Sequence, residues 1–74
     1  MRRYPLDESL ATHLARERRA RGLTQNQLAL AAGLTEGAIS KYERLAYGIP
    51  PEALAAIERA LAEAARRTVG AVTR

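Results

Sequence analysis

Two predicted helix starts in close succession constrain the fold of this chain more than any other feature. Thr24 and Gln27 have the spacing of a capping box, in which side chains satisfy free backbone N–H groups at the start of a helix. Thr35 can cap a second helix, and Gly33 can take the left-handed conformation that ends the first. We therefore predict one short helix from about Gln25 to Ala32 and another after Thr35. The connection is too tight for antiparallel packing, so the two helices should cross at a steep angle.

Longer helices are predicted on both sides of this pair. The first runs from about residue 7 to 21 and the last from about 51 to 67. Their apolar stripes consist of Leu6, Leu10 and Leu14 in the first and of Leu54, Ile57 and Leu61 in the last. No stretch alternates apolar and polar residues over the length of a strand. We therefore expect an all-α fold, a compact bundle of four to five helices, in one domain that spans residues 1–74.

The composition argues against several classes of site. The chain has no cysteine and a single histidine, so we expect no disulfide framework, no metal site and no cofactor. It has no glycine-rich phosphate loop and no paired carboxylates in a plausible cleft, so we do not expect an enzyme. No apolar run has the length of a membrane span or the pattern of a signal peptide, and a cytoplasmic location is expected by default.

The charge favours an anionic partner. The net charge is +4 and the pI is near 10.3, and Lys41 is the single lysine among basic residues that are otherwise arginines. Arginine suits planar, bidentate contacts with phosphate and guanine. This balance fits a nucleic acid or an anionic membrane surface. Because the basic residues do not gather along one polar helix face, the membrane is the weaker interpretation.

The region from Leu23 to Arg44 carries a family resemblance. Its residues are Leu23, Thr24, Gln25, Asn26, Gln27, Leu28, Ala29, Gly33, Leu34, Thr35, Ile39, Ser40, Lys41, Tyr42, Glu43 and Arg44. This pattern resembles the lambda-repressor-like family of helix-turn-helix transcriptional regulators, the Cro and xenobiotic-response-element type, over roughly Leu10 to Leu61. The resemblance implies a bundle of four or five helices that binds double-stranded operator DNA, usually as a dimer. The motif spans residues 25–44, and its second helix would lie in the major groove.

The resemblance, together with the charges beside the motif, indicates which residues would contact DNA. The candidates for base contacts are Thr35, Glu36, Gly37, Ser40 and Lys41. A lysine can donate to guanine and a glutamate can accept from cytosine, although Glu36 can instead favour its own helix dipole. The candidates for phosphate contacts are Gln25, Thr24, Arg44, Arg19 and Arg21. Gln25 matches the phosphate-anchoring glutamine of the family, at a helix N-terminus that already favours anions. The two arginines of the first helix can equally belong to a solvated face.

Arg18 and Glu43 interrupt apolar faces of their helices. Arg18 continues the stripe of the first helix, and Glu43 follows Ile39 on the buried side of the third. Opposite charges in such positions are costly to bury apart. The family pairs the arginine and the glutamate at these positions, so we expect a structural ion pair between Arg18 and Glu43 and no DNA contact from either.

Two residues depart from the family pattern. The family commonly has a glycine just after the position of Arg44, where this chain has Leu45. We therefore expect the third helix to run a turn longer and to stop nearer Gly48. Gly37 is unusual inside a recognition helix and lowers helix stability. It can let the backbone approach DNA closely, or it can indicate a helix that recognises bases weakly or in an altered way.

The resulting functional prediction is a sequence-specific DNA-binding transcriptional regulator, a repressor on a two-fold symmetric operator. The antitoxin of a toxin–antitoxin pair is an alternative, as is a protein-interaction module such as an anti-repressor. We expect a homodimer through the last helix and the tail, residues 51–74, and no small-molecule ligand. The surface expected for the dimer is a second strip of small residues, made of Ala53, Ala56, Ala60 and Ala64, with Val69 and Val72 beyond it.

Overall fold

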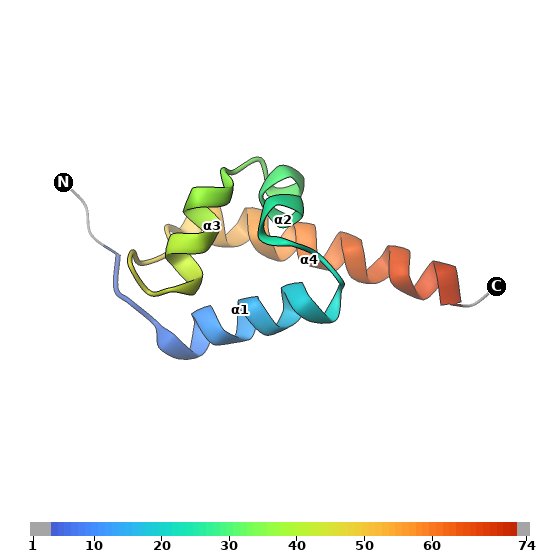
Figure 1. Ribbon diagram of the computed structural model, residues 1–74, viewed down its shortest axis with the longest axis horizontal. Helices are drawn as coiled ribbons and strands as arrows, with labels where there is room; N and C mark the ends of the chain where they lie inside the picture. The colour runs from blue at the N-terminus through green and yellow to red at the C-terminus, as the bar shows by residue number, and fades with distance from the viewer. Residues whose placement is uncertain (1–3, 73–74) are drawn as a thin grey trace.

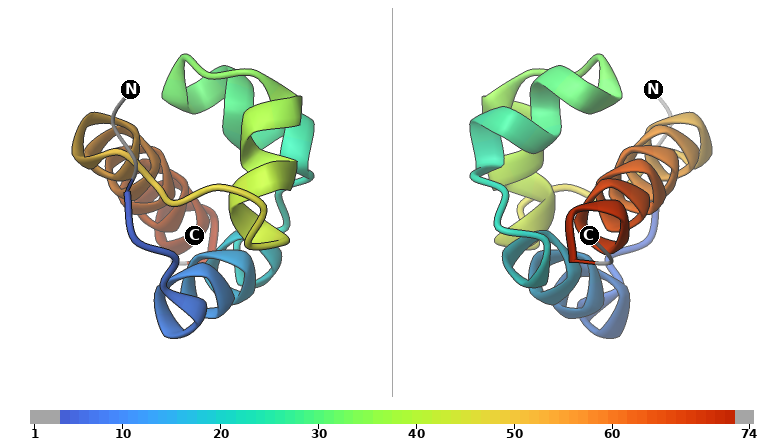
Figure 2. Two further views of the ribbon diagram at one scale, coloured as in Figure 1. Left: turned by 90° about the vertical axis from the view of Figure 1, so that its left-hand side faces the viewer. Right: turned by 90° about the vertical axis from the view of Figure 1, so that its right-hand side faces the viewer.

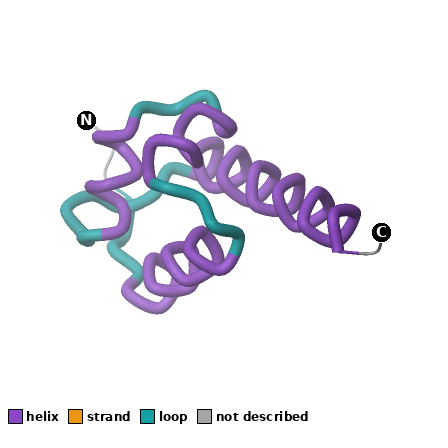
Figure 3. Tube along the Cα trace, turned by 45° about the vertical axis from the view of Figure 1, so that its right-hand side comes forward, coloured by secondary structure: helices purple, strands orange, loops and turns teal. Residues whose placement is uncertain are grey.

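The structure is a computed structural model that describes residues 4–72, with side chains as far as residue 67. It contains α1 (Glu8–Ala20), α2 (Gln25–Ala32), α3 (Glu36–Glu43) and α4 (Pro51–Val72). Figure 3 shows these helices joined by loops, and the described part of the chain holds no strand. The predicted all-α class is confirmed, and the bundle has four helices within the described residues. The predicted bounds of α2 are confirmed as well.

Local capping explains where the first three helices begin. The Asp7 side chain accepts a hydrogen bond of 3.0 Å from the backbone N–H of Leu10, at the start of α1. Thr24 accepts one of 3.0 Å from the Gln27 N–H, and the Thr24 N–H donates to Gln27 Oε1 over 2.8 Å. Both halves of the capping box are therefore formed at the start of α2. Thr35 caps α3 through an acceptor contact of 3.1 Å with the N–H of Ala38.

The turn between α2 and α3 depends on Gly33. This residue has a φ of +72°, in the left-handed region that glycine adopts at little cost. The N–H of Leu34 donates to the carbonyl of Ala29 over 2.8 Å, which closes the end of α2. The chain then enters α3 at once, so α2 and α3 cross instead of running side by side (Figure 1).

The core lies between α1, the α2–α3 pair and α4. Viewed along its length in Figure 2, the bundle has these three units as its sides. Each helix contributes an apolar residue to one cluster of buried side chains, namely Leu14, Leu28, Ile39 and Ile57. The last three of these are at most 2% exposed. The C-terminal half of α4 projects beyond the other helices (Figure 1).

The expectation that the third helix continues toward Gly48 is wrong. α3 ends at Glu43, because Leu45 takes the left-handed conformation itself, with a φ of +62°. The N–H of Ala46 then donates to the carbonyl of Lys41 over 2.9 Å, the bond that closes a Schellman-type helix end. A leucine therefore occupies the conformation that glycine usually provides, at a cost of about 1–2 kcal/mol.

The strip of alanines expected on the free side of the last helix is wrong in part. Ala53 and Ala60 are 5% and 6% exposed and belong to the core of the monomer. Ala56 is half-buried against the same core. Val69 and Val72 lie beyond the residues whose side chains the structure describes, and residues 73–74 lie outside the described chain. α4 is also longer than predicted, since it continues to Val72.

Gly48 allows the N-terminal segment to pack on the loop between α3 and α4. A Cβ atom on Gly48 would collide with the carbonyl group of Tyr4. The segment that precedes α1 therefore crosses this loop at a point where no side chain fits. The requirement comes from close packing, since the backbone of Gly48 has an ordinary negative or extended φ.

Candidate nucleic-acid interface

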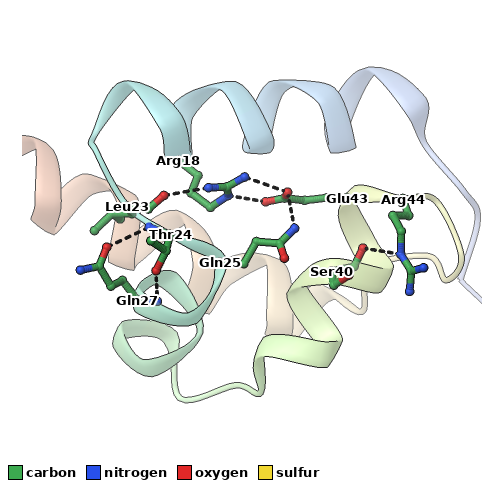
Figure 4. Close-up of polar contacts among 8 residues, drawn as sticks. All are labelled: Arg18, Leu23, Thr24, Gln25, Gln27, Ser40, Glu43 and Arg44. Carbon is green, nitrogen blue, oxygen red and sulfur yellow. Dashed lines mark hydrogen bonds and ion pairs between the residues drawn. The ribbon is translucent and has the colours of Figure 1, made fainter.

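Arg18 connects three elements of the fold beneath the exposed face of α3. Its Nε donates to Glu43 Oε2 over 2.7 Å, and its second terminal nitrogen donates to Glu43 Oε1 over 3.2 Å. The first terminal nitrogen donates to the carbonyl of Leu23 over 2.7 Å. Figure 4 shows these contacts converging between α1 and the ends of α2 and α3. The guanidinium therefore links α1 to the approach to α2 and to the end of α3.

Gln25 completes this network from the first turn of α2. Its amide nitrogen donates to Glu43 Oε1 over 3.0 Å (Figure 4). Burial favours the neutral acid and by itself would raise the pKa of Glu43. The hydrogen bonds from Arg18 and Gln25 outweigh burial, and the pKa of Glu43 lies below its ordinary value. Glu43 is therefore a charged hydrogen-bond acceptor at neutral pH.

The outer face of α3 carries the residues predicted to contact bases. Glu36, Gly37 and Lys41 are exposed and Ser40 is half-buried, so these residues share the side of the helix that faces away from the core. Thr35 is exposed at the N-cap, where its hydroxyl oxygen accepts from Ala38. A Cβ atom on Gly37 would meet no atom within 4 Å, so nothing inside the protein requires glycine at this position.

Two contacts hold charged side chains of this face from outside α3. Asn26 Nδ2 donates to Glu36 Oε1 over 3.3 Å, at the beginning of the helix. The Nζ atom of Lys41 lies 5.1 Å from the centre of the Tyr47 ring, a cation–π contact near its end. Neither Asn26 nor Tyr47 was singled out from the sequence as a functional residue. Asn26 could have been considered, because it stands at the start of α2 near the crossing. Tyr47 gave no signal, since the helix was expected to continue toward it.

Comparison with known families assigns the chain to one of them. A family model described as Helix-turn-helix matches residues 14–67, which is more than half of the chain. The chain belongs to this helix-turn-helix family. The family is the lambda-repressor-like one, a family of DNA-binding regulatory domains, so the predicted resemblance is confirmed. No curated protein and no solved structure matches the chain.

In the helix-turn-helix framework, α2 and α3 are the two helices of the motif and α3 is the recognition helix. Residues 14–67 also include most of α1 and the larger part of α4, the helices that complete the core. The network of Arg18, Gln25 and Glu43 therefore joins both helices of the motif to α1.

The arginines predicted to contact phosphate differ in how they are held. Arg44 follows the recognition helix and is exposed, with its Nε 3.4 Å from the carbonyl of Ser40 (Figure 4). Arg19 is exposed near the end of α1. Arg21 is half-buried and pairs with Glu17 over 2.8 Å, which leaves less of its charge for an outside partner. Among these three residues, Arg44 and Arg19 have the more accessible charges.

Neither a metal-ligand cluster nor a helix suited to span a membrane occurs among residues 4–72. They contain no group of three or more histidine, cysteine, aspartate or glutamate side chains that could hold a metal ion. Among them, no helix combines the length and the apolar character needed to cross a membrane.

Proposed function

We propose that this protein is a sequence-specific transcriptional regulator, a repressor, that inserts α3 into the major groove of a two-fold symmetric operator. The observation that carries the proposal is the polar outer face of the recognition helix, which the buried Arg18–Glu43 pair holds against the rest of the bundle. A helix held in this way can present donors and acceptors to base edges without rearrangement of its backbone. Membership of a DNA-binding family supports the same interpretation.

The proposed contacts fall into two groups. Those with base edges come from Thr35, Glu36, Gly37, Ser40 and Lys41. Those with phosphates come from Thr24, Gln25, Arg44, Arg19 and Arg21. Gln25 has one amide hydrogen committed to Glu43, so its second hydrogen would reach the phosphate. Backbone N–H groups in the first turn of α2 that have no partner within the helix would complete that anchor.

A homodimer is part of the proposal. A single recognition helix reads only a few base pairs, which is too little to distinguish one operator from the many competing sites in a genome. A two-fold dimer doubles the contact and matches half-sites about one helical turn apart. The projecting half of α4 supports this arrangement, because it extends beyond the core that it closes (Figure 1).

Selection of bound sites from random duplex DNA tests the proposal directly. We expect a preferred sequence with two-fold symmetry, and an affinity that falls steeply with salt, with a slope of about −0.9 per phosphate contact. Sedimentation of the free protein and of its complex would give the stoichiometry. Equal affinity for all duplexes at moderate salt would overturn the proposal and would favour a protein-interaction module on the same fold.

A further inference from the structure

The proposed reading surface is the outer face of α3, formed by Thr35, Glu36, Gly37, Ser40 and Lys41. The contact between Lys41 and Tyr47 lies on this surface but involves a residue outside the recognition helix. Tyr47 is in the loop between α3 and α4, and its side chain is largely in solvent, since the residue is 57% exposed. Its ring lies below the Lys41 ammonium, 5.1 Å from Nζ to the ring centre. The ring also lines a cavity with Leu45 and Pro5, but Tyr47 is not part of the buried core, so its packing alone does not account for its place beside a candidate base reader.

We propose that Tyr47 is a positioning residue that holds the Lys41 ammonium toward the base it reads, so that part of the base preference is set outside the recognition helix. This inference rests on the proposed function, because it assumes that Lys41 contacts a base. It adds the means by which that contact becomes specific.

The turn after α3 explains how Tyr47 reaches this position. Leu45 is left-handed, and the N–H of Ala46 donates to the carbonyl of Lys41 itself. This bond brings the chain back beside the last turn of α3, so that the next side chain, Tyr47, can meet Lys41. If α3 continued as a regular helix through residue 47, that hydrogen bond would not form. The unusual leucine at the helix end is therefore linked to the contact on the reading surface.

The chemistry of lysine makes such positioning useful. A lysine ammonium is a point charge on a flexible stem, and it has no planar fork that would orient it toward a base. Lys41 is also the single lysine in a chain whose other basic residues are arginines. A ring that confines the ammonium reduces the conformational freedom that DNA binding would otherwise remove. The result should be stronger discrimination at the base pair that Lys41 reads.

Variants at both positions can separate positioning from a direct contact by the tyrosine. Lys41→Ala first identifies the base pair whose preference depends on the ammonium. Tyr47→Leu removes the ring, whereas Tyr47→Phe keeps the ring and removes the hydroxyl. We expect Tyr47→Leu to reduce discrimination at that base pair by about two- to fivefold, the range of an exposed cation–π contact, and Tyr47→Phe to retain it. In the Lys41→Ala background, Tyr47→Leu should have no further effect on this preference.

The contact between Lys41 and Tyr47 can also be measured in the free protein, without DNA. The methylene protons next to Nζ of Lys41 should show an upfield ring-current shift in the NMR spectrum of the free protein. The shift should persist in Tyr47→Phe, so a folding defect of Tyr47→Leu would leave the contact testable. Thermal unfolding of each variant would separate a change in preference from a change in stability.

Several outcomes would overturn the inference. They are the absence of the ring-current shift, an equal loss in Tyr47→Phe and Tyr47→Leu, a uniform loss of affinity for all duplexes, and a Lys41→Ala variant that keeps every base preference. If the unaltered protein shows no sequence preference at all, the proposed function itself fails. A specific protein whose preference is independent of Tyr47 would retain that function and refute only the positioning role.

Discussion

Arg18 Nε donates to Glu43 Oε2 over 2.7 Å and so joins α1 to the last residue of α3. The two side chains are 11% and 10% exposed, and each charge therefore depends on the other for most of its stabilisation. The same guanidinium donates to the carbonyl of Leu23, and the same carboxylate accepts from Gln25. The pair therefore sets how the recognition helix sits on α1 and on the start of α2.

Removing one partner of this pair should destabilise the fold more than removing both. Arg18→Leu leaves the Glu43 carboxylate buried without its cation, and we expect the free energy of unfolding to fall by about 3–5 kcal/mol. The double variant with Glu43→Leu removes both charges and should be more stable than Arg18→Leu alone. Urea denaturation followed by circular dichroism would measure these differences.

The pair of Arg21 and Glu17 provides a matched control. It is nearly as short, at 2.8 Å, but its side chains are 28% and 33% exposed, and its residues are four apart at the end of α1. Arg21→Leu should therefore cost no more than about 1 kcal/mol. Similar losses for Arg18→Leu and Arg21→Leu would show that the Arg18–Glu43 pair does not hold the helices together.

Stability should fall in acid because of Glu43. Its folded pKa is lower than the ordinary value, since the hydrogen bonds from Arg18 and Gln25 outweigh the effect of burial. A carboxylate of this kind contributes stability above its unfolded pKa, and that stability is lost as the pH falls through the folded pKa. We expect the free energy of unfolding to decrease below about pH 4.5, the unperturbed value for glutamate.

Glu43→Gln isolates this contribution. The variant keeps the size of the side chain but cannot titrate, so its free energy of unfolding should depend less on pH in the acid range. Glu63→Gln is the control variant, because the contacts of Glu63 with Arg66 and Arg67 are exposed and are 3.3 and 4.0 Å long. An acid dependence that is identical in the unaltered protein and in Glu43→Gln would contradict the assignment.

The left-handed residue at the end of α3 leads to a test in which glycine and alanine should differ. Leu45 has a φ of +62° and is half-buried, and it lines a small cavity together with Pro5 and Leu10. Leu45→Ala loses that packing and keeps the backbone strain, whereas Leu45→Gly loses the packing and relieves the strain. We expect the glycine variant to be more stable than the alanine variant by about 1 kcal/mol, measured by urea denaturation. The opposite order would mean that the turn is not left-handed in solution.

The local parts of the fold could be predicted because their causes are local. The capping residues Thr24 and Thr35, with Gly33 between them, are sufficient to indicate where α2 begins and ends and where α3 starts. The end of α3 could not be predicted in the same way. Leucine does not favour the left-handed region, and Leu45 lines a cavity together with residues from distant parts of the chain, Pro5 and Leu10 among them.

The same distinction applies to the faces of α4 and to the reading surface. Ala53 and Ala60 are at helical spacing from Ile57, but they were assigned to an interface because small residues suit a core and an interface equally. The contacts that Asn26 and Tyr47 make with α3 join separate segments, so they depend on the crossing of α2 and on the turn after α3. Sequence spacing could place residues on a face of one helix but could not identify their neighbours from other segments.

Gly37 in the recognition helix leads to a prediction that separates stability from DNA binding. An added Cβ would meet no atom within 4 Å, so Gly37→Ala should fit the folded protein. Because alanine is the better helix former, we expect the free energy of unfolding to rise by about 0.5–1 kcal/mol. Gly48→Ala is the contrasting variant, since its Cβ would collide with the carbonyl of Tyr4, and it should be less stable than the unaltered protein.

Gly37→Ala should weaken DNA binding although it stabilises the fold. If the backbone of α3 approaches a base edge closely at this position, the new methyl group would occupy the space that the DNA needs. Titration of the selected duplex should then show weaker binding by the more stable Gly37→Ala protein. A variant that gains stability and keeps its full affinity would show that the start of α3 does not approach DNA closely, and base reading would then have to come from the residues around Lys41.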